Sequence, residues 1–180
     1  MKILVTGGLG FIGSHTVVEL QNEGFDVIAV DNLSNSSIEV VDGIERITGK
    51  KPIFEKLDLR DKKAVQDFFK KYQDIAGVIH FAASKAVGES MTEPLKYYEN
   101  NLFSLINVLQ EFKERNISNF IFSSSCTVYG QADQMPIDEN TPLKEAESSY
   151  GKTKQMGEDI LKDFSRAYNK KVSLLRYFNP

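Results

Sequence analysis

Short apolar runs alternate with longer segments of helical periodicity along the whole chain, and this pattern limits the fold more than any other feature. Alternating strand and helix signals are typical of a parallel sheet that is covered by helices on both faces. The sequence therefore predicts an α/β fold with a doubly wound parallel sheet. The expected strands are residues 2–6, 25–30, 52–57, 77–82, 119–123 and 172–178.

Glycine, proline and serine mark the ends of the expected helices. Gly24 is placed to stop the first helix, and Pro94 suits the first turn of a later one. Ser36 and Glu39 have the spacing of a capping box. Residues 131–149 contain two prolines and lack periodicity, which predicts a long surface loop. A length of 180 residues suits a single domain of this kind.

The composition argues against several classes of partner. The net charge is -3 and there is no dense block of lysine and arginine, so we do not expect nucleic acid or a membrane as a main partner. No stretch approaches the ~20 apolar residues of a membrane span, and we expect a cytoplasmic protein. Cys126 is the only cysteine, which excludes an internal disulfide, and with two histidines no metal site is expected.

A glycine-rich segment follows the first expected strand. Its glycines fit two registers, Gly8-x-Gly10-x-x-Gly13 or Gly7-x-x-Gly10-x-x-Gly13. Glycines between a strand and a helix let backbone N–H groups approach a phosphate, as in dinucleotide-binding folds of Rossmann type. A turn that only links strand to helix is the alternative, so the loop needs support from residues further along the chain.

Asp31 supplies this support, because it ends the second expected strand near the ~20-residue spacing at which an acid binds the adenosine ribose. A carboxylate there repels a 2′-phosphate and residues 32–35 contain no arginine, which favours NAD over NADP. A cap on the next turn is the alternative role of Asp31. Asp58 could meet the adenine amino group, or it could cap a helix or lie in a solvated turn. The mostly small residues 81–84 could let the cofactor pass or simply pack well.

Tyr150 and Lys154 lie four residues apart, on one face of a helix expected to begin near Ser149. A phenol with a pKa of ~10 is a poor base at neutral pH, and nearby positive charge lowers its pKa. We therefore expect Lys154 and an oxidised nicotinamide to make Tyr150 a general base. Since this spacing is also common by chance, the position of the pair after the fifth strand carries the argument.

Three serines, Ser123 to Ser125, end that fifth strand at the carboxyl edge of the sheet, where ligands of open α/β sheets bind. A hydroxyl there can bind a substrate oxygen and the tyrosine, which makes Ser125 or Thr127 a candidate proton shuttle. Capping and loop solvation are the ordinary roles of such serines, and they account for most of the cluster.

The glycine loop, the acid, the serines and the Tyr150–Lys154 pair occur in an order that resembles the extended short-chain dehydrogenases/reductases over essentially the whole chain. Within that family the chain is similar to the UDP-hexose 4-epimerases. The related dehydratases have an Asp-Glu pair after the serine or threonine of the fifth strand, where this chain has Cys126 and Thr127. The motifs that carry the resemblance are residues 6–15, 31–36, 85–90, 123–130 and 176–180.

The resemblance implies that Tyr150 removes the proton from the 4-hydroxyl of a UDP-sugar, which Lys85 and Ser125 help to bind, while hydride passes from C4 to NAD. Return of hydride to the other face would interconvert UDP-glucose and UDP-galactose, as in galactose metabolism. It also implies a homodimer through helices that match residues 94–115 and 150–168. The NAD-binding residues that it implies are Gly7, Gly10, Phe11, Ile12, Gly13, Asp31, Asn32, Leu33, Ser34, Asn35, Ser36, Asp58, Leu59, Phe81, Ala82, Ala83, Ser84, Lys85, Asn100, Tyr150, Lys154 and Phe178.

Members of this family are much longer, and this chain stops at Asn179 and Pro180, where the crossing into the nucleotide-sugar domain begins. We therefore expect residues 1–180 to be an NAD-binding Rossmann domain without the uridine site and without the last strand of the sheet. Two other hypotheses stay open. The protein could act as an epimerase, dehydratase or decarboxylase on another nucleotide sugar, or it could be a non-catalytic NAD-binding module.

Overall fold

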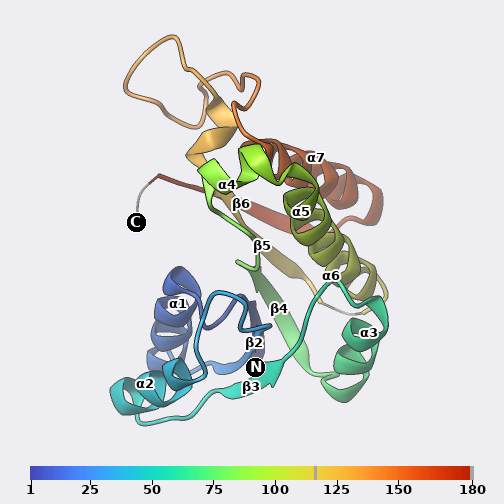
Figure 1. Ribbon diagram of the computed structural model, residues 1–180. Helices are drawn as coiled ribbons and strands as arrows, with labels where there is room; N and C mark the ends of the chain where they lie inside the picture. Colours follow the sequence, from blue (N-terminus) through green and yellow to red (C-terminus); the bar gives the residue numbers. More distant parts are fainter. Residues whose placement is uncertain (116, 179–180) are drawn as a thin grey trace.

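The computed structural model describes residues 1–115 and 117–178, so the expected crossing at Asn179 and Pro180 lies outside the described residues (Figure 1). Six strands form one sheet in which every pair is parallel, in the order β3-β2-β1-β4-β5-β6. The strands are β1 (Lys2–Thr6), β2 (Asp26–Asp31), β3 (Ile53–Lys56), β4 (Ile75–His80), β5 (Asn119–Ser125) and β6 (Lys171–Tyr177). The predicted doubly wound sheet is confirmed, and the strand order reverses between β1 and β4.

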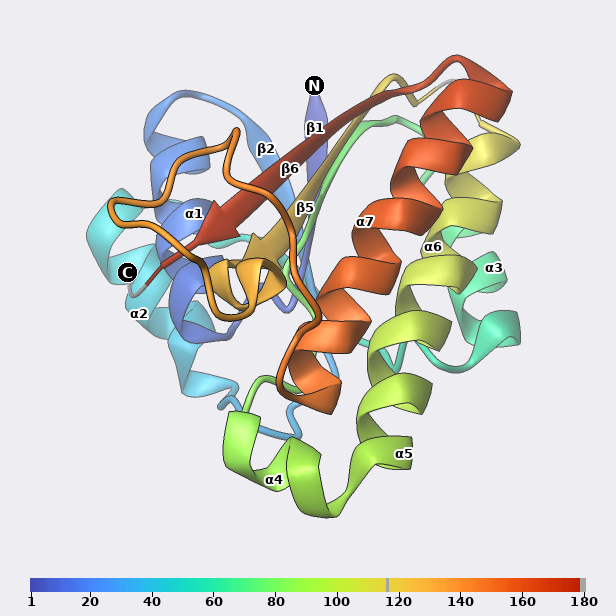
Figure 2. The same ribbon diagram turned by 90° about the horizontal axis from the view of Figure 1, so that it is seen from above.

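Helices cover both faces of the sheet, with α1 and α2 on one side and α3, α6 and α7 on the other (Figure 2). The α-helices are α1 (Phe11–Asn22), α2 (Glu39–Thr48), α3 (Lys62–Lys71), α4 (Val87–Thr92), α5 (Pro94–Tyr98), α6 (Ser104–Lys113) and α7 (Ser149–Tyr168). A π-helix, η1 (Glu99–Phe103), joins α5 to α6, and a 3-10 helix, η2 (Cys126–Tyr129), follows β5.

The central strands contribute side chains to two separate hydrophobic cores, because successive side chains of a strand point to opposite faces of the sheet. In β1, Leu4 packs with α3, α6 and α7, whereas Val5 packs with α1 and α2. Val78 and Ile79 of β4 divide in the same way. Both faces being buried explains why these strands are continuous apolar runs in the sequence.

Local signals predicted several helix ends, with one error. Gly24 follows α1 with φ +83°, and Pro94 stands in the first turn of α5, as expected. The predicted capping box is wrong, because α2 begins at Glu39 with Ile38 as its N-cap and no side-chain cap bond. The hydroxyl of Ser36 donates instead to Asp31 Oδ1 at 2.8 Å, a partner that local spacing did not suggest.

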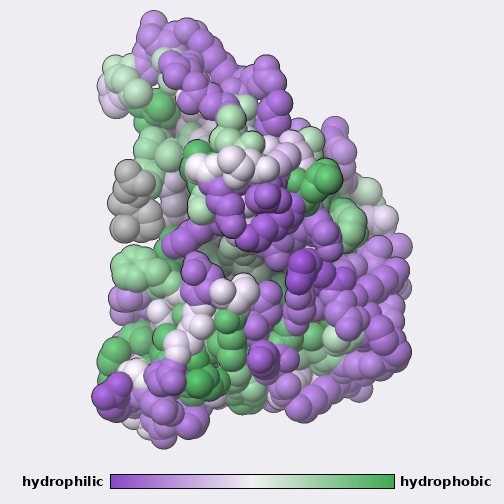
Figure 3. Space-filling model, in the orientation of Figure 1, coloured by the Kyte–Doolittle hydropathy of each residue, from purple (hydrophilic) through white to green (hydrophobic). Residues whose placement is uncertain are grey.

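The remaining differences concern boundaries. The fourth strand was expected at residues 77–82 and instead ends at His80. The long loop between η2 and α7 is irregular as predicted, projects from the body of the molecule and is hydrophilic over most of its visible surface (Figure 3). No helix in the described ranges has the length and apolar character needed to cross a membrane.

Candidate active site

The glycine loop between β1 and α1 is built by close backbone contacts. Gly7 has φ +64°, and a Cβ there would lie 2.8 Å from the backbone nitrogen of Ala82. A Cβ at Gly13 would lie 2.1 Å from the carbonyl oxygen of Gly7, which also accepts from the N–H of Gly10 at 3.1 Å. A Cβ at Gly8 would likewise lie 2.9 Å from the carbonyl oxygen of Val5, so these contacts confine Gly7, Gly8 and Gly13 alike, and the Gly7-x-x-Gly10-x-x-Gly13 register stays a prediction.

The N-terminus of α1 opens onto this loop without a side-chain cap. Gly10 is the N-cap residue, and the N–H of Ser14 makes the first helical hydrogen bond to its carbonyl oxygen at 2.8 Å. The N–H groups of Phe11, Ile12 and Gly13 consequently have no partner inside the helix. Such a helix end suits the pyrophosphate of a dinucleotide.

Asp31 ends β2 and organises the loop that follows. Its Oδ1 accepts from the N–H of Leu33 at 2.9 Å, and its Oδ2 accepts from the N–H of Leu9 at 3.2 Å. Leu33 has φ +62°, a left-handed conformation that costs about 1–2 kcal/mol in a residue other than glycine. The carboxylate thus joins the glycine loop to residues 32–36, the segment predicted to bind the adenosine ribose.

Asp58 lies just past β3 and is held by Arg60. Arg60 Nη2 donates to Asp58 Oδ2 at 2.6 Å, and this hydrogen bond keeps the pKa of Asp58 below its usual value. The helix-cap alternative for Asp58 is wrong, because Asp61 accepts from the N–H of Ala64 at the start of α3. The side chain of Leu59 is buried in the core, so its backbone is the part that a cofactor could contact.

Asn101 holds the segment after β4, although no sequence pattern singled it out. Its Oδ1 accepts from the N–H of Ser84 at 2.8 Å, and its Nδ2 donates to the carbonyl oxygen of Ser84 at 3.0 Å and to Thr153 Oγ1 at 2.9 Å. The predicted cofactor residue Asn100 donates to Asn101 from the same π-helix. Such π-turns often mark functional sites. This one ties Ser84 to Thr153 of α7.

Tyr150, Lys154 and Ser125 meet where α7 packs beside the end of β5. Lys154 Nζ donates to the carbonyl oxygen of Ser123 at 2.7 Å and lies 5.7 Å from the centre of the Tyr150 ring. Ser125 Oγ accepts from the N–H of Thr127 at 3.3 Å. The sequence therefore identified three side chains that the fold brings to one place.

Burial sets the ionisation of this pair. Desolvation raises the pKa of Tyr150, with a hydrogen bond from Ser125 acting in the opposite direction, and desolvation lowers the pKa of Lys154 to about 8. The expectation that Lys154 lowers the pKa of Tyr150 is therefore wrong for the protein's own groups. The oxidised nicotinamide remains the expected source of positive charge at the phenol.

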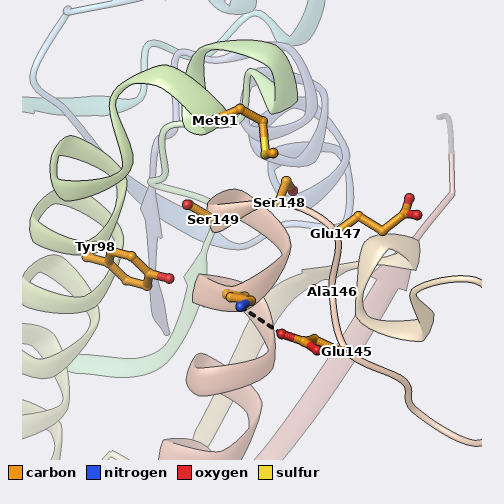
Figure 4. A pocket seen from close by; sticks show the side chains of 8 residues that line it. Met91, Tyr98, Glu145, Ala146, Glu147, Ser148 and Ser149 are labelled. Atoms are coloured by element: carbon orange, nitrogen blue, oxygen red, sulfur yellow. Dashed lines mark hydrogen bonds and ion pairs between the residues drawn. The ribbon is translucent and has the colours of Figure 1, made fainter.

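A cavity of about 430 Å³ lies beside the first turn of α7 (Figure 4). It is lined by Met91, Tyr98, Glu145, Ala146, Glu147, Ser148, Ser149 and Lys152. The ammonium group of Lys152 donates to Glu145 at 2.9 Å. None of the predicted site residues lines this cavity, so it is separate from the Tyr150–Lys154 pair.

Comparison with known proteins decides the family. The model of the NAD dependent epimerase/dehydratase family matches residues 3–180. The chain belongs to this family. The UDP-glucose 4-epimerase of Bacillus subtilis (strain 168) is 50% identical over 181 residues, which cover 100% of this chain and 53% of the relative. That of Erwinia amylovora is 46% identical, with 100% of this chain and 53% of the relative covered.

Solved structures give the same family. UDP-glucose 4-epimerase from Bifidobacterium longum in complex with NAD+ and UDP has a TM-score of 0.97 at 46% identity, covering 100% of this chain and 54% of that one. The enzyme from Stenotrophomonas maltophila, with NAD and formylated UDP-arabinopyranose, has a TM-score of 0.94 at 42% identity, covering 100% and 53%. The chain spans about half the length of the relatives it matches.

The residues of this NAD-dependent family member fit NAD. The glycine loop leaves no room for a Cβ at Gly7 or Gly13, so the backbone can approach a pyrophosphate closely. Asp31 places a carboxylate at the end of β2, next to the glycine loop, where it accepts from the N–H of Leu9. Phe178 follows β6 with its ring 6.3 Å from that of Tyr129, beside the serine end of β5.

Proposed function

We propose that this chain supplies the NAD-binding and proton-transfer half of an enzyme that interconverts UDP-glucose and UDP-galactose. The observation that carries the proposal is the meeting of Tyr150, Lys154 and Ser125 at the carboxyl edge of the sheet, on the same edge as the glycine loop. Identities of 46–50% to UDP-glucose 4-epimerases support it. The role in galactose metabolism follows from this substrate pair.

Each group has a defined task in this proposal. The N–H groups at the start of α1 hold the pyrophosphate, Asp31 holds the adenosine ribose and Lys154 holds the nicotinamide ribose. NAD supplies a reversible hydride acceptor for C4 of the sugar. Tyr150 takes the proton of the 4-hydroxyl and returns it, while Ser125 orients that oxygen. Because Cys126 and Thr127 follow Ser125 without an acidic pair, epimerisation is favoured over elimination.

The whole protein is proposed to be a cytoplasmic homodimer. Exposed apolar side chains gather along α5 to α6, where Leu95 is 79% exposed and Phe103 and Ile106 are also exposed, and Met156 is exposed on the neighbouring α7. Apolar side chains on adjoining helices suit a helical interface between two copies. The uridine of the substrate is proposed to be bound by the half of the protein that follows this chain.

The test is Tyr150→Phe in the full-length protein, assayed with UDP-glucose and with a panel of other UDP-sugars. Loss of the general base should lower turnover by about 100-fold or more, while NAD stays bound because the phenyl ring remains. Tyr168→Phe, at the far end of α7, is the matched control and should keep wild-type turnover. Near-normal turnover of Tyr150→Phe would refute the base assignment, and a preference for another sugar would correct the substrate.

A further inference from the structure

Glu158 is a fully buried carboxylate that the proposed chemistry does not use. It lies on the same face of α7 as Tyr150 and Lys154, four residues beyond the lysine, and its exposed fraction is 0%. Its Oε1 accepts from the hydroxyl of Ser124 at 2.6 Å, and its two oxygens accept from Nε and Nη2 of Arg176, each at 2.8 Å. Glutamate is almost never fully buried unless it is paired, so this arrangement needs a reason.

Arg176 of β6 links Glu158 of α7 to Tyr129 of η2, just past the end of β5. Its Nη1 donates to the hydroxyl of Tyr129 at 2.9 Å, and its guanidinium lies 4.9 Å from the centre of the Tyr129 ring. Tyr129 is 2% exposed, and its ring faces Phe178. We call Glu158, Arg176 and Tyr129 the buried polar network.

Stability does not explain the buried polar network. Replacing a buried ion pair with apolar side chains of similar volume is often neutral or stabilising, because both charges lose their hydration. Close packing already docks α7 on β5, since a Cβ at Gly157 would lie 2.7 Å from the ring of Phe122. The ion pair adds a fixed orientation of Arg176 relative to Glu158, because the planar guanidinium group binds a carboxylate in a defined geometry.

The buried polar network stands at the nicotinamide end of the site. A dinucleotide crosses the sheet at the point where the strand order reverses, here between β1 and β4. With Asp31 and the glycine loop on the β1–β2 side, the other nucleotide extends past the ends of β4, β5 and β6. Ser125 follows Ser124 at that edge, and Phe178 follows β6.

We propose that the buried polar network fixes the positions of Ser125 and Phe178 relative to Tyr150 and Lys154, and thereby seats the nicotinamide half of NAD against the proton-transfer groups. Its members are positioning residues, since they act through their neighbours. The link to proton transfer rests on the proposed function, whereas the effect on NAD binding does not. A misplacement of ~1 Å at such a site can cost ~100-fold in rate.

The first experiment compares two ligands on Tyr129→Phe by calorimetry. NAD contains the nicotinamide half, and ADP-ribose lacks the nicotinamide ring but keeps the adenosine and pyrophosphate. We expect the affinity for NAD to fall about fivefold or more, the effect of one lost hydrogen bond in the network, while the affinity for ADP-ribose stays within about twofold. Tyr72→Phe is the control, because it also removes a hydrogen-bonded tyrosine hydroxyl. That hydroxyl donates to Glu55 of β3, at the other end of the sheet.

Two results would overturn the proposal. Equal losses for NAD and ADP-ribose would mean that Tyr129 serves only the general fold, and unchanged affinities for both would mean that Tyr129 does not position the nicotinamide half.

A second variant separates stability from position. Glu158→Leu combined with Arg176→Met replaces both charged side chains with apolar side chains of similar volume. We expect this double variant to unfold at or above the wild-type temperature, and its ratio of NAD to ADP-ribose affinity to fall about tenfold. A folded double variant with the wild-type ratio would show a merely structural ion pair. If it does not fold, Tyr129→Phe decides.

Turnover distinguishes this inference from the proposed function. In a full-length protein that epimerises a UDP-hexose, Tyr129→Phe should lower kcat about tenfold and leave KM for the sugar within about twofold. Absence of turnover in the wild type would defeat the proposed function alone, since the ratio of NAD to ADP-ribose affinity can still be measured. A wild-type ratio in Tyr129→Phe would defeat the inference alone.

Discussion

The two ends of the dinucleotide site are held together in different ways. On the β1–β2 side many of the contacts join near neighbours, such as Gly7 with Gly10 and Asp31 with Leu33, although Asp31 also accepts from Leu9. On the β4–β6 side they join distant segments, as when Asn101 bonds Thr153, and they include buried charges such as Glu158. The adenosine end is therefore fixed by local backbone geometry, and the nicotinamide end by the docking of α7.

This difference predicts different consequences of mutation. At the adenosine end, substitutions should act through backbone collisions and should weaken binding of the whole dinucleotide. At the nicotinamide end, they should act through buried charge, and removing one partner should be worse than removing both. The following changes test these two expectations.

The largest effect is expected from Arg176→Met, which removes the hydrogen-bonded ion-pair partner of the buried Glu158. Among the described residues only Lys162, at 3.6 Å, then remains as a charged partner. The loss should be about 3–5 kcal/mol in the free energy of unfolding, measured with urea. Adding Glu158→Leu should return the free energy of unfolding to the wild-type value or above it. If the double variant is as unstable as the single one, the loss comes from packing around Arg176 and the nicotinamide end is less dependent on charge than we infer.

Gly13→Ala should give the next largest effect and act on the adenosine end. Its methyl group would lie 2.1 Å from the carbonyl oxygen of Gly7, so the loop or α1 must move. We expect a stability loss of about 3 kcal/mol and weaker binding of both NAD and ADP-ribose by calorimetry. Gly43→Ala in α2, where a Cβ meets nothing within 4 Å, is the control and should be neutral or slightly stabilising. Wild-type affinities in Gly13→Ala would contradict a loop set by this contact.

Lys154→Met should change stability in the opposite direction. Burial lowers the pKa of Lys154 to about 8, so at pH 7 the folded chain carries a charged group that is costly to bury. Without NAD, the variant should be about 2 kcal/mol more stable at pH 7 while binding NAD less tightly. This advantage should shrink as the pH rises from 8 towards 10.5, where the wild-type lysine is neutral in the fold. Lys152→Met, an exposed control, should change stability little.

The smallest effect concerns pH and His80. Burial, with the nearby charge of Lys154, lowers the pKa of His80 to about 3, so the imidazole stays neutral in the folded chain. The unfolded chain, with a histidine pKa of ~6.5, binds the extra proton as the pH falls, and stability should drop by about 1.5 kcal/mol between pH 6.5 and 5. His80→Gln should flatten this slope in urea titrations. An unchanged slope in His80→Gln would place its origin elsewhere.

The features that sequence could predict have local causes. The alternation of strands and helices, the glycine loop, Asp31 and the spacing of Tyr150 and Lys154 all follow from nearby residues. Ser36 was predicted to cap a helix. Its actual hydrogen bond, to Asp31, forms only when the loop of residues 32–36 folds back, and local spacing does not show this. The spacing of Tyr150 and Lys154 did not reveal the burial that raises the pKa of Tyr150 in the absence of NAD.

Glu158 was missed for a related reason. On a helix a glutamate is usually solvated, and its burial here depends on Ser124 and Arg176, which come from other strands. Asn101 was missed because its partners, Ser84 and Thr153, lie in different elements. The adenosine end was thus largely predictable, and the geometry of the nicotinamide end was not.

The outer edge of β6 has a consequence for handling the protein. In the described part of the sheet β6 pairs with β5 alone, and its seven residues include Leu175, which is 41% exposed. Arg176, the arginine of this strand, binds the buried Glu158 and therefore does not protect the edge with its charge. A long open strand is a template for strand addition. A sample containing only these 180 residues should therefore form sheet-linked aggregates as its concentration rises, and light scattering should detect them.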